Sequence, residues 1–219
     1  GILLGGIPGV SPTEIVIVGA GNAGTVAARA ALALGASVKV FDDDINKLRT
    51  IQQVLGQGLF TSNFHPNVLH NAFRTADVVI GAMRYINTRY RYVIAEELVR
   101  TMKRGSLVID LRISQGGCFE TTCCLANSDP SVFEQYGVLH YCMPNISNRV
   151  ARTTSMAFSN IFVPVFLSLG DAGTVQNMIK TDDGFRSGVY MYCGKPVNSY
   201  VSNHFNLSSN NLDLYLSAF

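Results

Sequence analysis

The amino-acid sequence predicts an α/β fold in which helices cover both faces of a parallel sheet. Short apolar runs rich in β-branched residues alternate along the chain with helical patterns, which is typical of such sheets. A glycine-rich turn joins the first of these runs directly to the first helix. The chain has 219 residues, of which 47% are hydrophobic and 15% are charged, so it is long enough for one large globular domain or one and a half.

Six strands are expected, and each is a short apolar run bounded by polar residues or glycine. In chain order they are "EIVIVGAG" at 14–21, "SVKVFD" at 37–42, "LFTSN" at 59–63, "ADVVIGAM" at 76–83, "SLVIDL" at 106–111 and "VLHYCM" at 138–143. The third run is the weakest strand pattern of the six.

Helical patterns separate these strands. The first is an alanine-rich stretch at 25–34, and Gly35 closes it where a left-handed residue is needed. A second helix begins at Ile45, for which Asp44 is a candidate N-cap. The remaining helices of this part are expected at 68–74 and, as an amphipathic helix that Gly105 stops, at 94–103.

The character of the sequence changes near residue 153. Residues 1–152 hold the alternating strands and helices and form one expected domain, whereas residues 153–219 indicate a long helix and then a polar tail rich in Asn and Ser. That tail has too little apolar content to be a domain by itself. The apolar run at 161–169 is interrupted by Pro164 and is too short to cross a bilayer, so we expect a buried helix and no membrane span.

Composition and cysteine usage exclude several classes of function. A net charge of +2 gives no argument for nucleic acid, a membrane surface or an acidic partner. The five cysteines lack the spacing of a zinc site, so we expect reduced thiols, no metal site and, without a signal peptide, a cytoplasmic protein. The apolar opening "GILLGGIPGV" indicates either a start in the middle of a longer protein or a tag remnant on a natural terminus.

The segment "GAGNAG" has the G-x-G-x-x-G spacing, with Gly19, Gly21 and Gly24, between an expected strand and an expected helix. In such a loop the first glycine permits a tight turn, the second lets a pyrophosphate approach the backbone, and the third lets helix and strand pack closely. The helix N-terminus adds positive potential. The predicted fold is therefore a Rossmann-type doubly wound parallel sheet with a C-terminal helix and tail.

Asp42 ends the second expected strand, eighteen residues after Gly24. A carboxylate at this place accepts hydrogen bonds from the adenosine ribose hydroxyls of NAD, and it repels the additional phosphate of NADP. Asp43 and Asp44 add to the negative field, although Asp44 has the alternative role of N-cap. We therefore predict that the cofactor is NAD.

Several segments together resemble the NAD-binding half of the alanine dehydrogenase family. These segments are "LLGGIPGVSPTEIVIVGAGNAG", "ADVVIGAM", "MKRGSLVIDL", "QGGCFETT" and "HYCMPN", and the resemblance extends to the final "GVYMYCGKPVNSYV". The chain is similar, less closely, to the proton-translocating nicotinamide nucleotide transhydrogenases. "QGGCFET" is the most specific segment and favours the dehydrogenase branch.

The resemblance implies the domain organisation and a set of cofactor-binding residues. The family has a second domain, formed by an N-terminal segment and the C-terminal tail, which carries the arginine, lysine and histidine that bind and process the amino acid. Residues 153–219 are then half of a substrate domain whose other half is missing here, and this segment alone is expected to be inactive. The predicted cofactor-binding set is Gly19, Gly21, Asn22, Ala23, Gly24, Asp42, Ala82, Met83, Leu111, Asn145 and Ile146.

Ser114 is the candidate catalytic residue, because in the family an aspartate occupies its position beside the nicotinamide and the substrate. A carboxylate can act as a base near neutral pH. A lone serine hydroxyl cannot do so unless a neighbouring base activates it. Two interpretations stay open: Ser114 is a neutral hydrogen-bond donor in a working dehydrogenase, or it marks an altered substrate or lost activity.

The sequence differs from the family pattern in two further places, and both are expected at the carboxyl ends of the strands, where ligands of such folds bind. Arg112 replaces a small apolar residue, although it could instead face a neighbouring helix, and "INTRYR" at 86–91 replaces the family's "PGAKAP". The interleaved Arg and Tyr residues there favour a solvated loop or subunit contact over nucleic-acid binding. His140 is expected to be a satisfied core histidine, and nothing near Cys118 indicates an activated thiolate.

The implied reaction of the whole protein is the oxidative deamination of L-alanine with NAD and water to pyruvate, ammonia and NADH. Its substrate partners would be a small amino acid or a 2-oxo acid. A homo-oligomer is expected from the family and from the apolar helix at 161–169. The alternatives are a dinucleotide-binding sensor or subunit that has lost the chemistry, and a different amino- or imino-acid oxidoreductase.

Overall fold

The computed structural model describes the chain except for residues 57, 84–92, 125–131 and 218–219. Its contacts divide the chain into two compact units, Gly1–Ile146 and Ser147–Phe219. The boundary lies six residues before the one expected from the sequence, at the start of the segment that leads into the long helix. Each unit is described separately.

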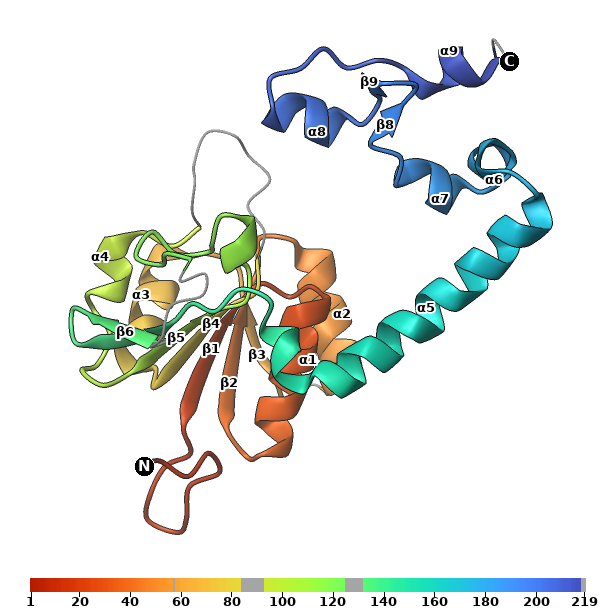
Figure 1. Cartoon of the computed structure of the whole chain (residues 1–219). Helices are drawn as coiled ribbons and strands as arrows, with labels where there is room; N and C mark the ends of the chain where they lie inside the picture. The colour runs from red at the N-terminus through yellow and green to blue at the C-terminus, as the bar shows by residue number, and fades with distance from the viewer. Residues whose placement is uncertain (57, 84–92, 125–131, 218–219) are drawn as a thin grey trace. The chain divides into compact units, whose positions relative to one another are not determined.

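Among the described residues of the first unit, seven strands form one sheet in the order β3-β2-β1-β4-β5-β7-β6 (Figure 1). The strands are β1 (Glu14–Val18), β2 (Ser37–Phe41), β3 (Phe60–Ser62), β4 (Val78–Gly81), β5 (Leu107–Asp110), β6 (Val132–Gln135) and β7 (Val138–Tyr141). All neighbours pair in parallel except β6 and β7. The strand order reverses between β1 and β4, where ligands bind in sheets of this kind.

Helices cover both faces of this sheet (Figure 1). Along β1, alternate residues point to opposite faces, so Ile15 and Ile17 join one buried cluster while Val16 and Val18 join the other. Helices α1 (Asn22–Ala33) and α2 (Ile45–Leu55) contribute to the first cluster, and α3 (Pro66–Thr75) and the short α4 (Glu96–Val99) contribute to the second. The predicted doubly wound architecture is therefore confirmed.

The local predictions hold in most places. All six expected strands form, Gly35 has the expected left-handed φ of 83°, and the Asp44 side chain caps α2 by accepting a hydrogen bond from the Asn46 N–H. The helix expected at 94–103 is wrong in length, because α4 has only four residues. Ile94 instead forms an isolated bridge with Phe119, so the helix cannot begin there.

Strand β6 was not expected from the sequence. Tyr136 and Gly137 both have positive φ, 58° and 77°, and this tight turn folds β6 back against β7. The centre of the Tyr136 ring lies 4.0 Å from the Arg100 guanidinium carbon, and the Tyr136 hydroxyl donates a hydrogen bond to Glu96. The antiparallel edge strand is thus fastened to α4.

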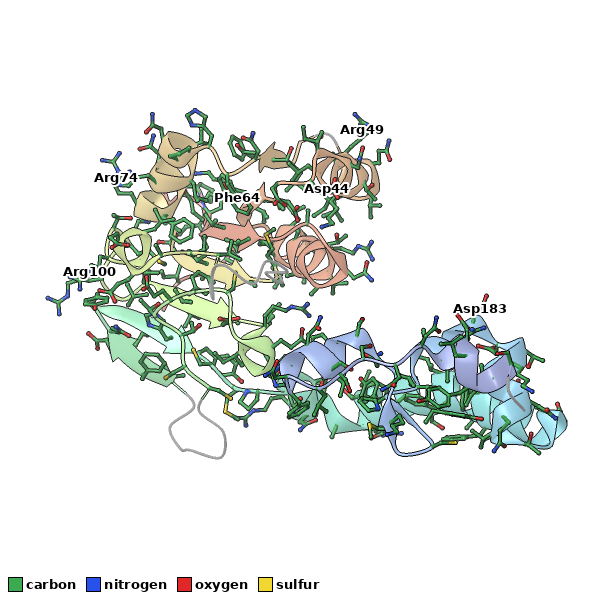
Figure 2. The ribbon with its side chains drawn as sticks, turned by 90° about the horizontal axis from the view of Figure 1, so that it is seen from above. Asp44, Arg49, Phe64, Arg74, Arg100 and Asp183 are labelled. Atoms are coloured by element: carbon green, nitrogen blue, oxygen red, sulfur yellow. The ribbon has the colours of Figure 1, made fainter. Side chains whose placement is uncertain are left out.

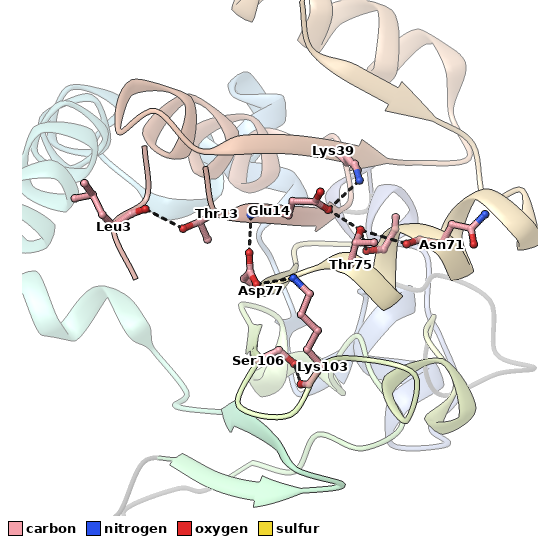
Figure 3. Close-up of polar contacts among 10 residues, drawn as sticks. Leu3, Thr13, Glu14, Lys39, Asn71, Thr75, Asp77, Lys103 and Ser106 are labelled. Carbon is pink, nitrogen blue, oxygen red and sulfur yellow. Dashed lines mark hydrogen bonds and ion pairs between the residues drawn. The ribbon is translucent and has the colours of Figure 1, made fainter. Parts of the chain in front are cut away.

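A polar network ties together the amino ends of the strands, on the edge opposite the candidate site (Figure 3). The Lys39 ammonium lies 3.0 Å from the Glu14 carboxylate, and the Lys103 ammonium lies 2.8 Å from the Asp77 carboxylate. Burial raises the pKa of both carboxyl groups, but hydrogen bonds and the lysine charges outweigh it, so each pKa is lowered. Both carboxylates therefore stabilise the fold above the ordinary carboxyl pKa and cease to do so in acid.

The second unit is small and has little core. It contains the long helix α5 (Ala151–Ala172), after the 3₁₀ turn η2 (Ile146–Val150), and then α6 (Val175–Thr181) and α7 (Asp183–Ser187). A two-stranded hairpin of β8 (Met191–Tyr192) and β9 (Lys195–Pro196) precedes α8 (Ser199–His204) and α9 (Leu212–Ser217). Within its described residues only Met178, Ile179 and Ser202 are buried.

The expectation of a buried helix at 161–169 is wrong. The helix forms as part of α5, but no residue of α5 is buried, because the few apolar residues of this unit cannot cover it. Its exposed side chains include Ile161, Phe162, Phe166 and Leu167. Judged by length and composition alone, Ile146–Ala172 is the one stretch among the described residues that could cross a membrane.

Burial of a neutral imidazole predicts acid lability. His140 in β7 is fully buried, its Nδ1 lies 3.0 Å from the Val138 carbonyl, and its Nε2 lies 2.9 Å from the Thr121 hydroxyl. Burial lowers the pKa of His140 although the hydrogen bond to Val138 acts in the opposite direction. The unfolded chain therefore binds this proton more readily, and stability is lost as pH falls below the unfolded value of about 6.5.

We expect urea unfolding of the protein between about pH 5 and 8 to show this loss of stability, and His140→Gln to flatten the slope below about pH 6.5. His70 is an exposed histidine on α3 and provides the matched control. His70→Gln should leave the slope unchanged. An unchanged slope in the His140 variant would contradict the assignment.

Candidate functional site

The candidate site lies at the carboxyl edge of the sheet, where the loop from β1 to α1 crosses the strand-order reversal. Gly19 has a φ of 113°, and a side chain there would place its Cβ 2.7 Å from the Met83 backbone nitrogen. The Gly19 N–H donates to the Phe41 carbonyl at 2.7 Å. Only glycine can make this turn, because the ends of β2 and β4 enclose it.

Gly24 is closely surrounded by other atoms, whereas the space beside Gly21 is open. A Cβ at Gly24 would lie 1.8 Å from the Gly19 carbonyl oxygen, so this glycine allows α1 to pack directly on the loop. A Cβ at Gly21 would meet no atom within 4 Å, so the space beside its backbone is open. The backbone is thus bare and accessible at the position where the sequence predicts a pyrophosphate.

The N-terminus of α1 adds hydrogen-bond donors beside this open space. Asn22 and Ala23 are exposed in the first turn, and no side chain caps the helix. The first intrahelical bond of this turn runs from the Thr25 N–H to the Gly21 carbonyl, at 2.8 Å. The N–H groups ahead of it are available to an anion, which the helix dipole also favours.

Asp42 lies at the end of β2 and is 1% exposed. Its Oδ2 accepts the Ala20 N–H at 2.8 Å, and its Oδ1 accepts the Asp44 N–H at 2.9 Å. Each carboxylate oxygen has two lone pairs, so one on each remains for a further donor. The carboxylate therefore shapes the glycine loop and keeps acceptor capacity that the described residues do not use.

Lys47 is a neighbour of Asp42 that the sequence analysis missed. Its ammonium lies 3.9 Å from Asp42 Oδ1 and 3.9 Å from Asp44 Oδ2. The signal was available, since Lys47 stands one helical turn after the N-cap Asp44 and such pairs share a helix face. The cation reduces the net negative charge at the end of β2.

The structure brings three more of the predicted residues to the same edge. The Ala82 N–H donates to the Val18 carbonyl at 2.8 Å, and the Leu111 N–H donates to the Gly81 carbonyl at 2.9 Å. Met83 lies against Gly19. Gly81 is required because any Cβ there would lie 2.5 Å from the Phe119 ring.

The buried carboxylate of Asp110 organises the loop after β5. Its Oδ1 accepts the Arg112 N–H at 2.9 Å, and its Oδ2 accepts the Cys118 N–H at 2.8 Å and the Thr122 hydroxyl at 2.7 Å. These bonds hold the 3₁₀ turn η1 (Ile113–Gln115) at the carboxyl edge. The sequence analysis assigned Asp110 no role.

Ser114 is exposed in the middle of η1. Among the described residues its hydroxyl makes no hydrogen bond, and no base lies within hydrogen-bond distance of it. The loop thus presents the serine at the mouth without a group that could activate it.

Asn145 and Ile146 follow β7, the parallel neighbour of β5, and are exposed. Asn145 has a left-handed φ of 51°, a conformation that Asn tolerates better than most residues. The second expected departure, residues 86–91, lies outside the described residues.

The other titratable candidates at this edge do not have catalytic properties. Burial raises the pKa of the Cys118 thiol to about 12, and burial likewise raises that of Cys142 to about 12. Both thiols are therefore protonated at neutral pH. His140 is a satisfied core histidine, as predicted, and stacks on Phe133 at 4.9 Å. The described residues contain no cluster of His, Cys, Asp and Glu that could hold a metal ion.

Comparison with known proteins agrees with this geometry. Residues 1–199 match the family model described as "Alanine dehydrogenase/PNT, C-terminal domain". The chain is 36% identical over 207 residues to an alanine dehydrogenase of Halomonas elongata, covering 94% of this chain and 55% of that protein. It is 34% identical, with the same coverage, to alanine dehydrogenase 2 of Staphylococcus aureus. The chain thus spans about half the length of these curated relatives.

Solved structures agree with the sequence relatives. An L-alanine dehydrogenase superposes with a TM-score of 0.84 at 32% identity, over 94% of this chain and 56% of that one. The transhydrogenase from Sinorhizobium meliloti shares the fold, with a TM-score of 0.67 at 22% identity over 87% of this chain and 51% of that one. The glycine loop, the strand order and these matches together show that the chain belongs to the alanine dehydrogenase/PNT family, in the region of its C-terminal domain.

Proposed function

We propose that this chain is the NAD-binding part of an alanine-dehydrogenase-like enzyme that interconverts L-alanine and pyruvate. The observation that carries the proposal is the juxtaposition at the strand-order reversal. The open backbone at Gly21, the uncapped start of α1 and the buried carboxylate of Asp42 lie around one edge of the sheet. Together they provide what a dinucleotide requires: a bare approach for its pyrophosphate, donors for its charge and an acceptor for its ribose.

Different residues at this edge bind different parts of the dinucleotide. The first turn of α1 holds the pyrophosphate, and Asp42 holds the adenosine ribose on the β2 side. Ala82, Met83, Leu111, Asn145 and Ile146, at the ends of β4, β5 and β7, surround the nicotinamide half. A bound nicotinamide ring would supply the hydride acceptor, and the protein contributes orientation and electrostatics.

A sensor or subunit with altered catalysis is the second candidate, and Ser114 is the observation that favours it. This exposed hydroxyl has no base beside it in the described residues, whereas the resemblance places a carboxylate there. The glycine loop and Asp42 follow the family pattern, whereas Ser114 and Arg112 at the end of β5 differ from it. Activity can thus be weak while cofactor affinity is retained.

The remaining assignments concern the whole protein. Five free cysteines suit a reducing compartment, so we place the protein in the cytoplasm. We propose that the exposed apolar side chains of α5 are covered in a homo-oligomer and not by a membrane, and that residues 153–219 contribute to a substrate domain. The substrates are a small amino acid and its 2-oxo acid, and nucleic acid is not a partner.

Cofactor choice tests the proposal through Asp42. We expect the protein to bind NADH more tightly than NADPH, and Asp42→Asn to weaken NADH binding by about 1–3 kcal/mol because the ribose loses a charged acceptor. Isothermal titration calorimetry with both cofactors measures this. Asp43 is an exposed neighbouring carboxylate, so Asp43→Asn is the matched control and should change NADH affinity little. Equal affinity of the wild type for NADPH would contradict the role of Asp42.

The rate of alanine oxidation tests the interpretation of Ser114. General acids and bases contribute about 10²–10⁴ in rate, so Ser114→Asp in the full-length protein should raise alanine oxidation by about tenfold or more. NADH affinity should change little. Steady-state rates from about pH 6 to 10 measure the effect, and Ser114→Asn controls for side-chain size. A fast wild type that the aspartate slows would place Ser114 in a working mechanism.

A further inference from the structure

Arg112 lies beyond the carboxyl end of β5, two residues after Asp110 and directly before η1. In the sheet order β3-β2-β1-β4-β5, this strand lies on the opposite side of the glycine loop from Asp42. A dinucleotide with its adenosine ribose at β2 and its pyrophosphate at β1 extends its nicotinamide toward β4 and β5. Arg112 is therefore on the side of the sheet where the reaction takes place, if the proposed function holds.

The backbone of Arg112 is fixed by three hydrogen bonds. Its N–H donates to Asp110 Oδ1 at 2.9 Å, and its carbonyl accepts the N–H groups of Gln115 and Gly117 at 2.8 and 3.1 Å. The Cα of Arg112 is therefore held in place, and only the side-chain rotamers remain to be ordered when a ligand binds.

The charge of Arg112, in contrast, has no partner in the described part of the chain. None of the ion pairs among those residues includes it, and its Nε is buried without a hydrogen-bond acceptor. Asp110 is the adjacent carboxylate, but its oxygens already accept the backbone N–H groups of Arg112 and Cys118 and the Thr122 hydroxyl. A partly buried cation with unused donors favours an anion from outside the fold.

We propose that Arg112 contributes to binding the carboxylate group of the substrate, in addition to the amino-acid-binding arginine and lysine that the resemblance implies for the other domain. This inference rests on the proposed function. A guanidinium presents paired N–H donors that match the two oxygens of a carboxylate. Both the amino acid and its 2-oxo acid carry a carboxylate next to the reacting carbon, so this contact fixes that carbon relative to the nicotinamide. Arg112 is only partly buried, so part of the residue is exposed beyond the carboxyl end of β5.

The test measures the binding of oxamate, an unreactive analogue of a 2-oxo acid, to the full-length protein saturated with NADH. Arg112→Gln should raise the dissociation constant of oxamate about tenfold or more, because the carboxylate loses one of its charged partners. The Kd for NADH, measured first on each variant, should change little. Arg74 is an exposed arginine on α3 that points away from the sheet (Figure 2). Arg74→Gln is therefore the control and should change neither constant.

The outcomes separate the two proposals. A wild type that does not bind NADH overturns the proposed function and this inference with it. A wild type that binds NADH but not oxamate, or binds oxamate equally well with Gln at 112, overturns this inference alone. A loss of NADH affinity in a folded Arg112→Gln variant would assign the arginine to the cofactor phosphates and also overturn it. If that variant unfolds, Arg112→Lys keeps the charge without the paired donors, and oxamate binding as tight as in the wild type would contradict the proposal.

Discussion

The close contact between α1 and the turn after β1 is the constraint on which the rest of the site depends. A Cβ at Gly24 would lie 1.8 Å from the Gly19 carbonyl oxygen, and one at Gly19 would press on the end of β4. These two glycines therefore set how near the helix N-terminus comes to the sheet. Because the strand order reverses at this point, the same contact places the helix N-terminus over the crevice between β1 and β4.

Two buried carboxylates lie on either side of the glycine loop and hold the neighbouring loops in place. Asp42 at the end of β2 holds the glycine loop through Ala20, and Asp110 at the end of β5 holds the loop that carries Arg112 and Ser114. In both places a charge is kept in the interior because backbone N–H groups satisfy it. Asp42 has lone pairs left for a ligand, whereas Asp110 is largely occupied by its own loop. One aspartate is thus suited to binding and the other to positioning.

The two units differ in how well they are stabilised by their own residues. The first has buried clusters on both faces of its sheet and an ionic network on its amino edge. The second buries Met178, Ile179 and Ser202 among its described residues and leaves the apolar side chains of α5 exposed. Exposed apolar area of this kind is usually covered by another protein surface, which is the physical reason to expect further chain or further subunits around α5.

The sequence by itself determined six of the seven strands described in the sheet, the glycine loop and the place of Asp42, because apolar periodicity and the demand for glycine are local properties of the chain. It could not determine the length of α4, the antiparallel strand β6 or the exposure of α5. Each of these depends on a partner distant in sequence or on the amount of apolar surface available to cover a helix, as Ile94 shows by pairing with Phe119 instead of starting α4. The roles of Ser114, Arg112 and Asn145 remain predictions. Tertiary structure alone decided that Asp110 serves its own loop and that Arg112 has no ionic partner among the described residues, because both results depend on how the loop after β5 folds back on the end of its strand.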